Sequence, residues 1–186
     1  MKLYALCDED LLLKYDMSLE EFVKRAKKSK AEVVQYRNKS NNIEYSKKQL
    51  IKLRKLYDGF LIINDFLELV EFCDGVHLGQ DDLKDFDLDS LEAAKVVRKL
   101  IGKDKLFGLS THSEAEIEVA NKMDLNYIGL GAYRASSTKN VTNVLGKKLI
   151  EYAKLSIHPV AAIGGLKLSD KLDVSYKVVG SNLYED

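Results

Sequence analysis

The chain has few of the residues that mark disulfide frameworks, metal clusters or membrane spans. It contains only two cysteines, Cys7 and Cys73, without a C-x-x-C pair or metal-ligand spacing, which fits buried free thiols in a reducing, cytoplasmic compartment. No stretch approaches the roughly 18 apolar residues of a membrane span. The apolar start of the chain is too short for a signal peptide and is followed at once by Asp8–Asp10, so it predicts a first strand.

Net charge is also lacking. The 29 basic and 29 acidic residues cancel, so no global charge would recruit nucleic acid or an anionic membrane. Recognition of phosphate must therefore be local. With 186 residues, 46% of them hydrophobic, the chain can bury one core as a single domain spanning 1–186.

Short apolar runs alternate with amphipathic segments along the whole chain. Most of the runs lack strict polar alternation, which is typical of parallel strands buried on both faces. The expected strands are Leu3–Cys7, Glu32–Tyr36, Gly59–Asn64, Gly75–Leu78, Leu106–Ser110, Tyr127–Leu130, Val160–Ile163 and Lys177–Val179. The expected helices are Ser18–Lys28, Asn42–Leu56, Phe66–Cys73, Ser90–Ile101, Ser113–Met123 and Leu145–Leu155.

Eight strands that alternate with helical segments favour a closed (β/α)8 TIM barrel over a doubly wound open sheet, which is the alternative architecture. The barrel would be small, because this fold typically takes about 250 residues. Only residues 166–176 separate the glycines after the seventh strand from the last strand, so we expect abbreviated C-terminal helices.

Polar residues follow six of the expected strands. In a barrel of this class the C-terminal strand ends and their loops form the active site, so these residues should share one rim. They are Gln35, Arg37, Lys39, Asn64, Asp65, Asp82, Ser110, Ser136, Thr138, Lys139, Gly164 and Gly165, with Gly180 and Ser181 after the last strand.

This set indicates a pyrophosphate held on a divalent metal. Asp65 and Asp82 supply carboxylate oxygens, which suit Mg²⁺ when substrate phosphate and water complete its shell. Arg37, Lys39 and Lys139 supply cations for the phosphate charge. The loop amides at Gly164–Gly165 and Gly180–Ser181 could hold a second phosphate. Taken singly, each feature has an ordinary reading as a helix cap, a turn or a surface charge.

The histidines give a weaker indication of a catalytic role than the polar rim residues do. His77 lies within a strand, where it is expected to be packed or hydrogen-bonded. A nucleophilic pair of Ser110 with His112 is disfavoured, because no third member is evident and G-x-S-x-G is missing.

The ordered motifs resemble the thiamine phosphate synthase family over about residues 2–181. They are Gln35-x-Arg37-x-Lys39, Ile63-Asn64-Asp65, Gly75-Val76-His77-Leu78-Gly79-Gln80-x-Asp82, Gly108-x-Ser110-Thr111-His112-Ser113, Tyr127-Ile128-Gly129-Leu130-Gly131, Thr138-Lys139 and Ala162-Ile163-Gly164-Gly165.

The resemblance implies a (β/α)8 transferase that joins a hydroxymethylpyrimidine diphosphate to a thiazole phosphate, releasing pyrophosphate and thiamine monophosphate. It assigns Mg²⁺ to Asp65 and Asp82. Around the pyrimidine diphosphate it places Gln35, Arg37, Lys39, Asn64, Ser110 and Lys139, and around the thiazole phosphate it places Ser136, Thr138, Gly165, Gly180 and Ser181. Arg37, Lys39, Ser110 and Lys139 would carry catalysis.

Three other readings stay open. A related thiazole tautomerase would need a histidine where this chain has Ala132. A non-catalytic thiazole- or phosphate-binding protein would suit the shortened end, where Gly180 replaces a usual aliphatic residue. Another phosphate-binding barrel enzyme is the third. The thin C-terminal wall also makes a homo-oligomer plausible.

Overall fold

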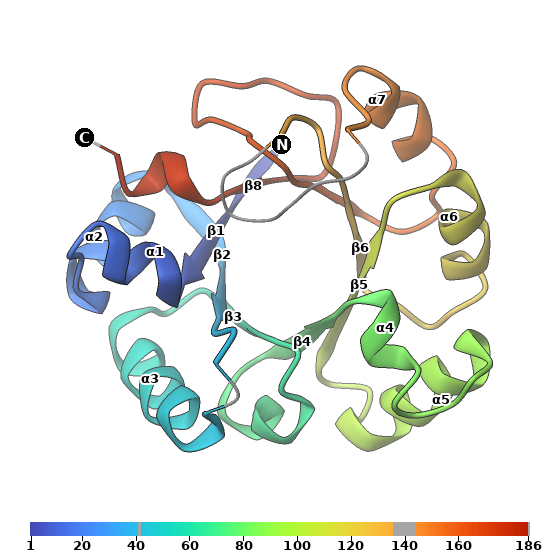
Figure 1. The fold of residues 1–186 in the computed structure, drawn as a ribbon, viewed down its shortest axis with the longest axis horizontal. Coiled ribbons are helices and arrows are strands. Elements are labelled where there is room, and N and C mark those ends of the chain that lie inside the picture. The colour runs from blue at the N-terminus through green and yellow to red at the C-terminus, as the bar shows by residue number, and fades with distance from the viewer. Residues whose placement is uncertain (41, 136–143, 186) are drawn as a thin grey trace.

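The computed structural model describes residues 1–40, 42–135 and 144–185. Its eight parallel strands close into one barrel in chain order, with β8 paired to β1 (Figure 1). The strands are β1 (Lys2–Asp8), β2 (Ala31–Arg37), β3 (Phe60–Asn64), β4 (Gly75–Leu78), β5 (Leu106–Thr111), β6 (Tyr127–Leu130), β7 (Val160–Ala162) and β8 (Tyr176–Val179). The predicted (β/α)8 barrel is confirmed, and the open sheet is excluded.

Helices ring the barrel on its outside (Figure 1). They are α1 (Glu9–Lys14), α2 (Leu19–Lys28), α3 (Ile43–Leu56), α4 (Gln80–Leu83), α5 (Ser90–Ile101), α6 (Glu114–Ala120) and α7 (Lys148–Ala153), with 3-10 turns η1 (Leu67–Phe72) and η2 (Ser181–Leu183). No helix joins β7 to β8, and a single 3-10 turn follows β8 in the described residues. The expected shortening of the C-terminal helices is confirmed.

Local signals explain most helix starts. Ser18 caps α2 by accepting the N–H of Glu21 at 3.1 Å, and Asn42 caps α3 in the same way. The Glu21 carboxylate accepts a hydrogen bond from Arg25 Nε at 3.3 Å, one turn further along α2. The predicted helix over Phe66–Cys73 is the 3-10 turn η1.

Two apolar clusters fill the molecule. The larger one lies between the strands and the helices and includes Phe22, Leu50 and Phe107. The smaller one lies inside the barrel, where alternate strand residues point inward, and comprises Tyr4, Leu6, Val33, Ile62, Tyr127, Ala161 and Val178. The barrel is thus a packed core whose inward faces lead up to the rim at the strand ends.

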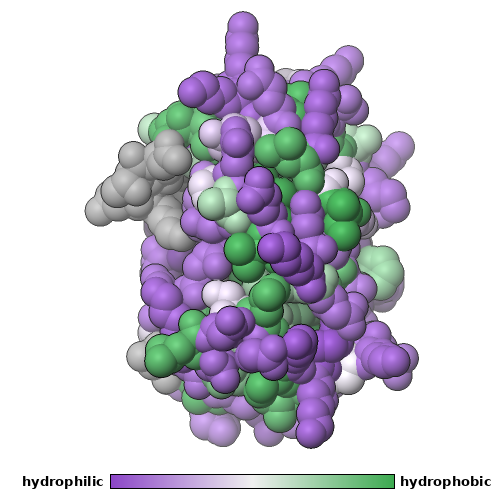
Figure 2. All heavy atoms as spheres, turned by 90° about the vertical axis from the view of Figure 1, so that its right-hand side faces the viewer, coloured by the Kyte–Doolittle hydropathy of each residue, from purple (hydrophilic) through white to green (hydrophobic). Residues whose placement is uncertain are grey.

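The face of the molecule shown in Figure 2 is mostly hydrophilic. Figure 2 views the side that carries α5 and α6 and shows apolar side chains scattered among polar ones. No helix in the described part of the chain is long and apolar enough to cross a membrane.

Candidate active site

Strand register brings the predicted rim residues to one end of the barrel. Asp8 at the end of β1 is the direct partner of Arg37 at the end of β2. In the same way Asn64 is level with His77, and Ser110 is level with Gly129. Because all strands are parallel, these positions share the C-terminal rim.

Arg37 and Lys39 each pair with a carboxylate at or just after the end of β1. Arg37 Nη1 donates to Asp8 Oδ2 at 2.7 Å, and Lys39 Nζ lies 3.3 Å from Asp10 Oδ2. Gln35, one inward position below Arg37, donates through Nε2 to the Tyr4 hydroxyl at 2.8 Å. Arg37 and Lys39 therefore bring cationic groups to the rim, as the sequence predicted.

Asp65 occupies a left-handed backbone conformation with φ of 69° directly after β3. Its N–H donates to the His77 carbonyl at 3.0 Å, which ties the end of β3 to β4. Asp tolerates this conformation better than most residues. Asn64 below it is buried, whereas Asp65 is exposed.

Asp82 lies in the short helix α4 that follows β4. Its Oδ2 accepts the N–H of Gly79 at 2.5 Å, so the carboxylate caps its own helix. Gln80, the first residue of α4, donates to the Ser110 carbonyl at 2.6 Å and joins α4 to β5. Asp65 and Asp82 thus follow neighbouring strands.

Carboxylate oxygens such as those of Asp65 and Asp82 are ligands that Mg²⁺ takes. The described residues contain no group of three or more His, Cys, Asp or Glu that could hold a metal ion. Mg²⁺, however, usually takes one or two protein carboxylates, with substrate phosphates and waters as its other ligands. The donors suit a metal that arrives with a diphosphate.

A chain of hydrogen bonds crosses the barrel interior below the rim. Tyr4 bonds the Tyr127 hydroxyl at 2.9 Å, Tyr127 bonds His77 Nδ1 at 3.1 Å, and His77 Nε2 bonds Ser110 Oγ at 2.9 Å. With the Gln35 contact, the chain connects β2 to β5. Burial raises the pKa of both tyrosine hydroxyls, so they stay protonated and can donate as well as accept.

The hydrogen bonds show the roles of His77 and His112. The expected packed and hydrogen-bonded state of His77 is confirmed. The partner of Ser110 is His77, while His112 Nδ1 instead pairs with Glu116 at 3.2 Å. Burial also raises the pKa of both cysteine thiols, which disfavours a thiolate nucleophile.

The candidate second phosphate loops lie after β7 and β8. Gly164 and Gly165 have φ of 103° and 58°, and a Cβ on Gly165 would lie 2.9 Å from the Ala135 carbonyl. Both positions therefore need glycine. Gly180 and Ser181 lie where β8 passes into η2. Ser136, Thr138 and Lys139 lie outside the described residues.

The sequence reading missed Asp8, Tyr4 and Tyr127. The signal was present in β1, where polar Tyr4 and Asp8 occupy the same alternate positions as buried Leu6. In the sequence, Asp8 stands out only as the first residue of the acidic run Asp8–Asp10. A polar residue at an inward strand position is the pattern that could have found them.

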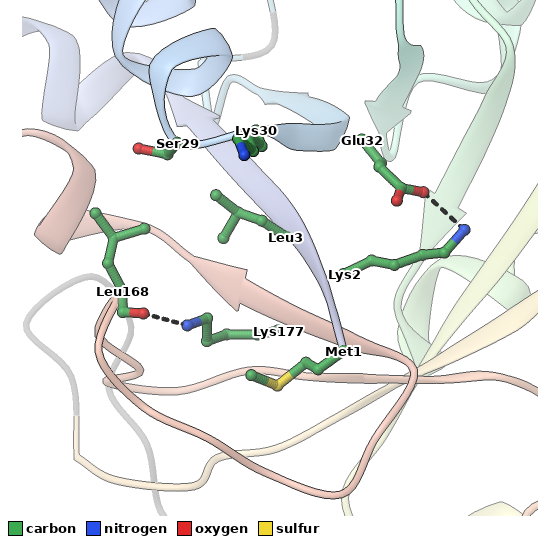
Figure 3. A pocket seen from close by; sticks show the side chains of 8 residues that line it. All are labelled: Met1, Lys2, Leu3, Ser29, Lys30, Glu32, Leu168 and Lys177. Atoms are coloured by element: carbon green, nitrogen blue, oxygen red, sulfur yellow. Dashed lines mark hydrogen bonds and ion pairs between the residues drawn. The ribbon is translucent and has the colours of Figure 1, made fainter.

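A hollow of about 300 Å³ lies at the opposite end of the barrel, lined by residues from the starts of β1, β2 and β8 (Figure 3). There Lys177 is buried and donates to the carbonyls of Leu168 and Asp170 at 2.5 and 2.9 Å. Burial lowers the Lys177 pKa. Its ammonium binds these two backbone carbonyls, and the hollow is separate from the candidate site because it lies at the other end of the strands.

Comparison with known proteins gives a consistent result. Residues 3–179 match the family model described as thiamine monophosphate synthase. Two curated thiamine-phosphate synthases are similar to the chain: that of Persephonella marina is 36% identical over 94% of this chain and 81% of its own length, and that of Lawsonia intracellularis is 35% identical over 89% and 74%.

Solved structures share the fold. A thiamine phosphate pyrophosphorylase from Pyrococcus furiosus superposes with a TM-score of 0.76 at 24% identity, covering 97% of this chain and 85% of that one. A chain of the tryptophan synthase complex from Pyrococcus furiosus superposes with a TM-score of 0.66 at 13% identity, covering 99% and 88%. At these identities the likeness establishes the barrel alone.

Proposed function

The chain belongs to the thiamine monophosphate synthase family, and from that membership we infer that it is a transferase with thiamine-phosphate synthase activity. The observation that carries this conclusion is the similarity to curated synthases at 36% and 35% identity over most of both chains. The substrates are a hydroxymethylpyrimidine diphosphate and a thiazole phosphate, and the products are thiamine monophosphate and pyrophosphate. Ala132, at the place of the tautomerase histidine, agrees with this reading.

The reaction exchanges a C–O bond for a C–N bond. Pyrophosphate leaves with the bonding electrons, and the pyrimidine methyl cation that remains is stabilised by its ring amine. The thiazole nitrogen then supplies the electron pair of the new bond. Negative charge therefore grows on the diphosphate, and cationic side chains at the rim stabilise it.

Each rim residue has a role in this scheme. Arg37 and Lys39, with Lys139, bind the departing diphosphate, while Gln35, Asn64 and Ser110 hold the pyrimidine. The hydrogen-bond chain through His77 fixes the Ser110 hydroxyl. The scheme needs no protein nucleophile, because the thiazole nitrogen supplies the attacking electron pair.

Asp65 and Asp82 would hold Mg²⁺. When bound, Mg²⁺ neutralises charge on the diphosphate and favours its departure. The support for this assignment is the pair of carboxylates after adjacent strands, beside the cations that the same phosphates need.

The thiazole phosphate is assigned to the loop amides at Gly165, Gly180 and Ser181, together with Ser136 and Thr138. Gly164 and Gly165 form a turn with positive φ directly after β7, and the support for this assignment is the position of that turn among the loops that often bind phosphate in such barrels. A cytoplasmic location is supported by the two buried free cysteines. Self-association into a homo-oligomer remains part of the proposal.

The test is to incubate the protein with both substrates and Mg²⁺ and to measure thiamine monophosphate and pyrophosphate. We expect both products in equal amounts, and none when EDTA removes the metal. Binding of thiazole phosphate without any product would instead identify a non-catalytic binding protein and overturn the proposal.

A further inference from the structure

We propose that Asp8 is a positioning residue that orients Arg37 toward the leaving diphosphate. The inference rests on the proposed function, because it takes Arg37 as a diphosphate ligand. Neither the family motifs quoted above nor the proposed site includes Asp8.

The pair is built into the barrel register. Asp8 and Arg37 are direct neighbours across β1 and β2, and both occupy inward positions at the uppermost layer. Their side chains meet at 2.7 Å, with exposed fractions of 3% for Asp8 and 19% for Arg37. An ion pair so shielded from water holds a fixed geometry better than a surface pair does.

Asp8 is itself held from two other directions. Its second oxygen, Oδ1, accepts the N–H of Leu11 at 3.3 Å and caps α1, and its backbone N–H donates to the Tyr184 hydroxyl at 2.9 Å. The carboxylate is therefore fixed by β1, by α1 and by the C-terminal segment. It can act as an anchor because its position does not depend on Arg37.

Arg37 differs from the arginines that only hold the fold. In Arg54, Nη1 bonds Asp74 at 2.7 Å, as Arg37 bonds Asp8, but Nη2 also donates to the carbonyls of Tyr57 and Gly59. Arg98 is likewise surrounded by backbone carbonyls. Arg37 has one hydrogen-bonding partner among the described residues, Asp8.

The remaining Arg37 donors face the rim. A guanidinium carries five N–H groups, of which the Asp8 contact takes one. No buried side-chain nitrogen or oxygen in the described ranges lacks a partner, so the other Arg37 nitrogens are open to solvent. A half-buried guanidinium that is anchored at one nitrogen and open at the others is arranged to bind an anion bidentately.

The isosteric variant Asp8→Asn separates orientation from charge. Asn is an equally good helix cap, so its one oxygen can keep the Leu11 contact while its NH₂ group faces Arg37 and breaks the pair. Removal of one negative charge would by itself strengthen binding of an anion. Weaker binding in this variant can therefore come only from lost orientation.

The probe is pyrophosphate with Mg²⁺, measured by calorimetry. We expect Asp8→Asn to weaken its binding by about tenfold, the scale of one charge-assisted hydrogen bond. The KM for the pyrimidine diphosphate should rise similarly, while the KM for the thiazole phosphate stays within about twofold. In an Arg37→Gln background, Asp8→Asn should weaken pyrophosphate binding no further.

The matched control is Asp74→Asn, which breaks an ion pair of the same length at the opposite end of the barrel. It should leave pyrophosphate affinity unchanged, and thermal unfolding of both variants checks that they fold. Unchanged or tighter binding of pyrophosphate by Asp8→Asn would overturn the inference. If the wild type forms no thiamine monophosphate, the proposed function fails instead, so the two failures are distinguishable.

Discussion

Asp65 combines an exposed carboxylate with a left-handed backbone at the end of β3. Such a conformation costs on the order of 1 kcal/mol for most residues and less for Asp or Asn. The N–H contact to the His77 carbonyl holds it in place. The strand end is thereby shaped so that the carboxylate meets the solvent-facing rim.

We expect Asp65→Asn and Asp82→Asn to lose Mg²⁺-dependent turnover by about a hundredfold or more, on the scale of lost stabilisation of transition-state charge. Asn accepts the left-handed backbone and can still cap α4, so circular dichroism should show an unchanged fold. Product formation against Mg²⁺ concentration is the measurement. The control is Asp81→Asn, an exposed neighbour paired with Lys84. Full activity in either main variant would refute the metal assignment.

Gly108 makes room for the hydrogen-bond chain inside the barrel. A Cβ at this position would lie 2.2 Å from the Tyr127 ring and 2.6 Å from His77 Nδ1. Gly108→Ala should therefore lower the free energy of unfolding by about 1–3 kcal/mol through overpacking. Urea denaturation followed by circular dichroism measures it. Gly180→Ala, where the nearest atom is 3.6 Å away, should destabilise much less.

At the scale of elements, the segment between β7 and β8 is held by ion pairing and backbone contacts in place of a helix. Arg134 binds both oxygens of Asp170, at 2.6 and 3.1 Å, and also donates to the Gly165 carbonyl. Lys177 on β8 holds the same segment from below. The loop after β6 is thus fastened to the loop that carries Gly165.

The Arg134 guanidinium holds the pKa of Asp170 at about 2, below its ordinary value of 3.8. Because the folded state has the lower pKa, the stabilisation is fully present above about pH 4 and is lost as the pH falls toward 2. Asp170→Asn should cost at most about 1 kcal/mol near neutral pH, since the pair is partly exposed.

The measurement is the difference in unfolding free energy between Asp170→Asn and wild type across this pH range. We expect the difference to shrink as the pH falls from about 4 and to approach zero only below about pH 2. Asp58→Asn, which changes a more distant and highly exposed pair with Lys27, should show little difference at any pH. A difference that does not change with pH would contradict the assigned role.

Across the whole molecule, Tyr184 joins the two ends of the chain. Its hydroxyl donates to the Leu6 carbonyl at 3.0 Å and accepts from the Asp8 N–H at 2.9 Å. Its ring packs against Phe22 and Tyr15. The segment after β8 is therefore fastened to the first strand, beside α2, without a full helix (Figure 1).

We expect Tyr184→Phe to lower the free energy of unfolding by about 1–3 kcal/mol, because two buried backbone groups lose their partner. Thermal and urea unfolding measure the loss. The matched control is Tyr152→Phe on α7, a half-buried tyrosine, for which we expect a change within about 0.5 kcal/mol. Equal stability of the two variants would show that Tyr184 does not fasten the chain ends.

Local sequence signals were enough to predict the eight strands, most of the helices, the barrel and the polar rim. Strand periodicity, caps and turn residues are local signals, so β4, β6 and α5 have their predicted bounds. The polar rim could be predicted because the carboxyl ends of parallel strands lie at the same end of a barrel. The short helices α1 and α4 escaped notice, since one turn or so of helix carries little periodic signal.

The pairing of side chains, in contrast, depends on how the strands pack. Arg37 pairs with Asp8, Ser110 with His77, and Tyr4 with Tyr127. Each pair joins residues far apart in the chain. Arg37 with Asp8 and Ser110 with His77 join directly paired strands, whereas Tyr4 on β1 and Tyr127 on β6 meet only inside the closed barrel. Barrel closure sets the register between strands, and that register is a property of the packed whole rather than of any local stretch.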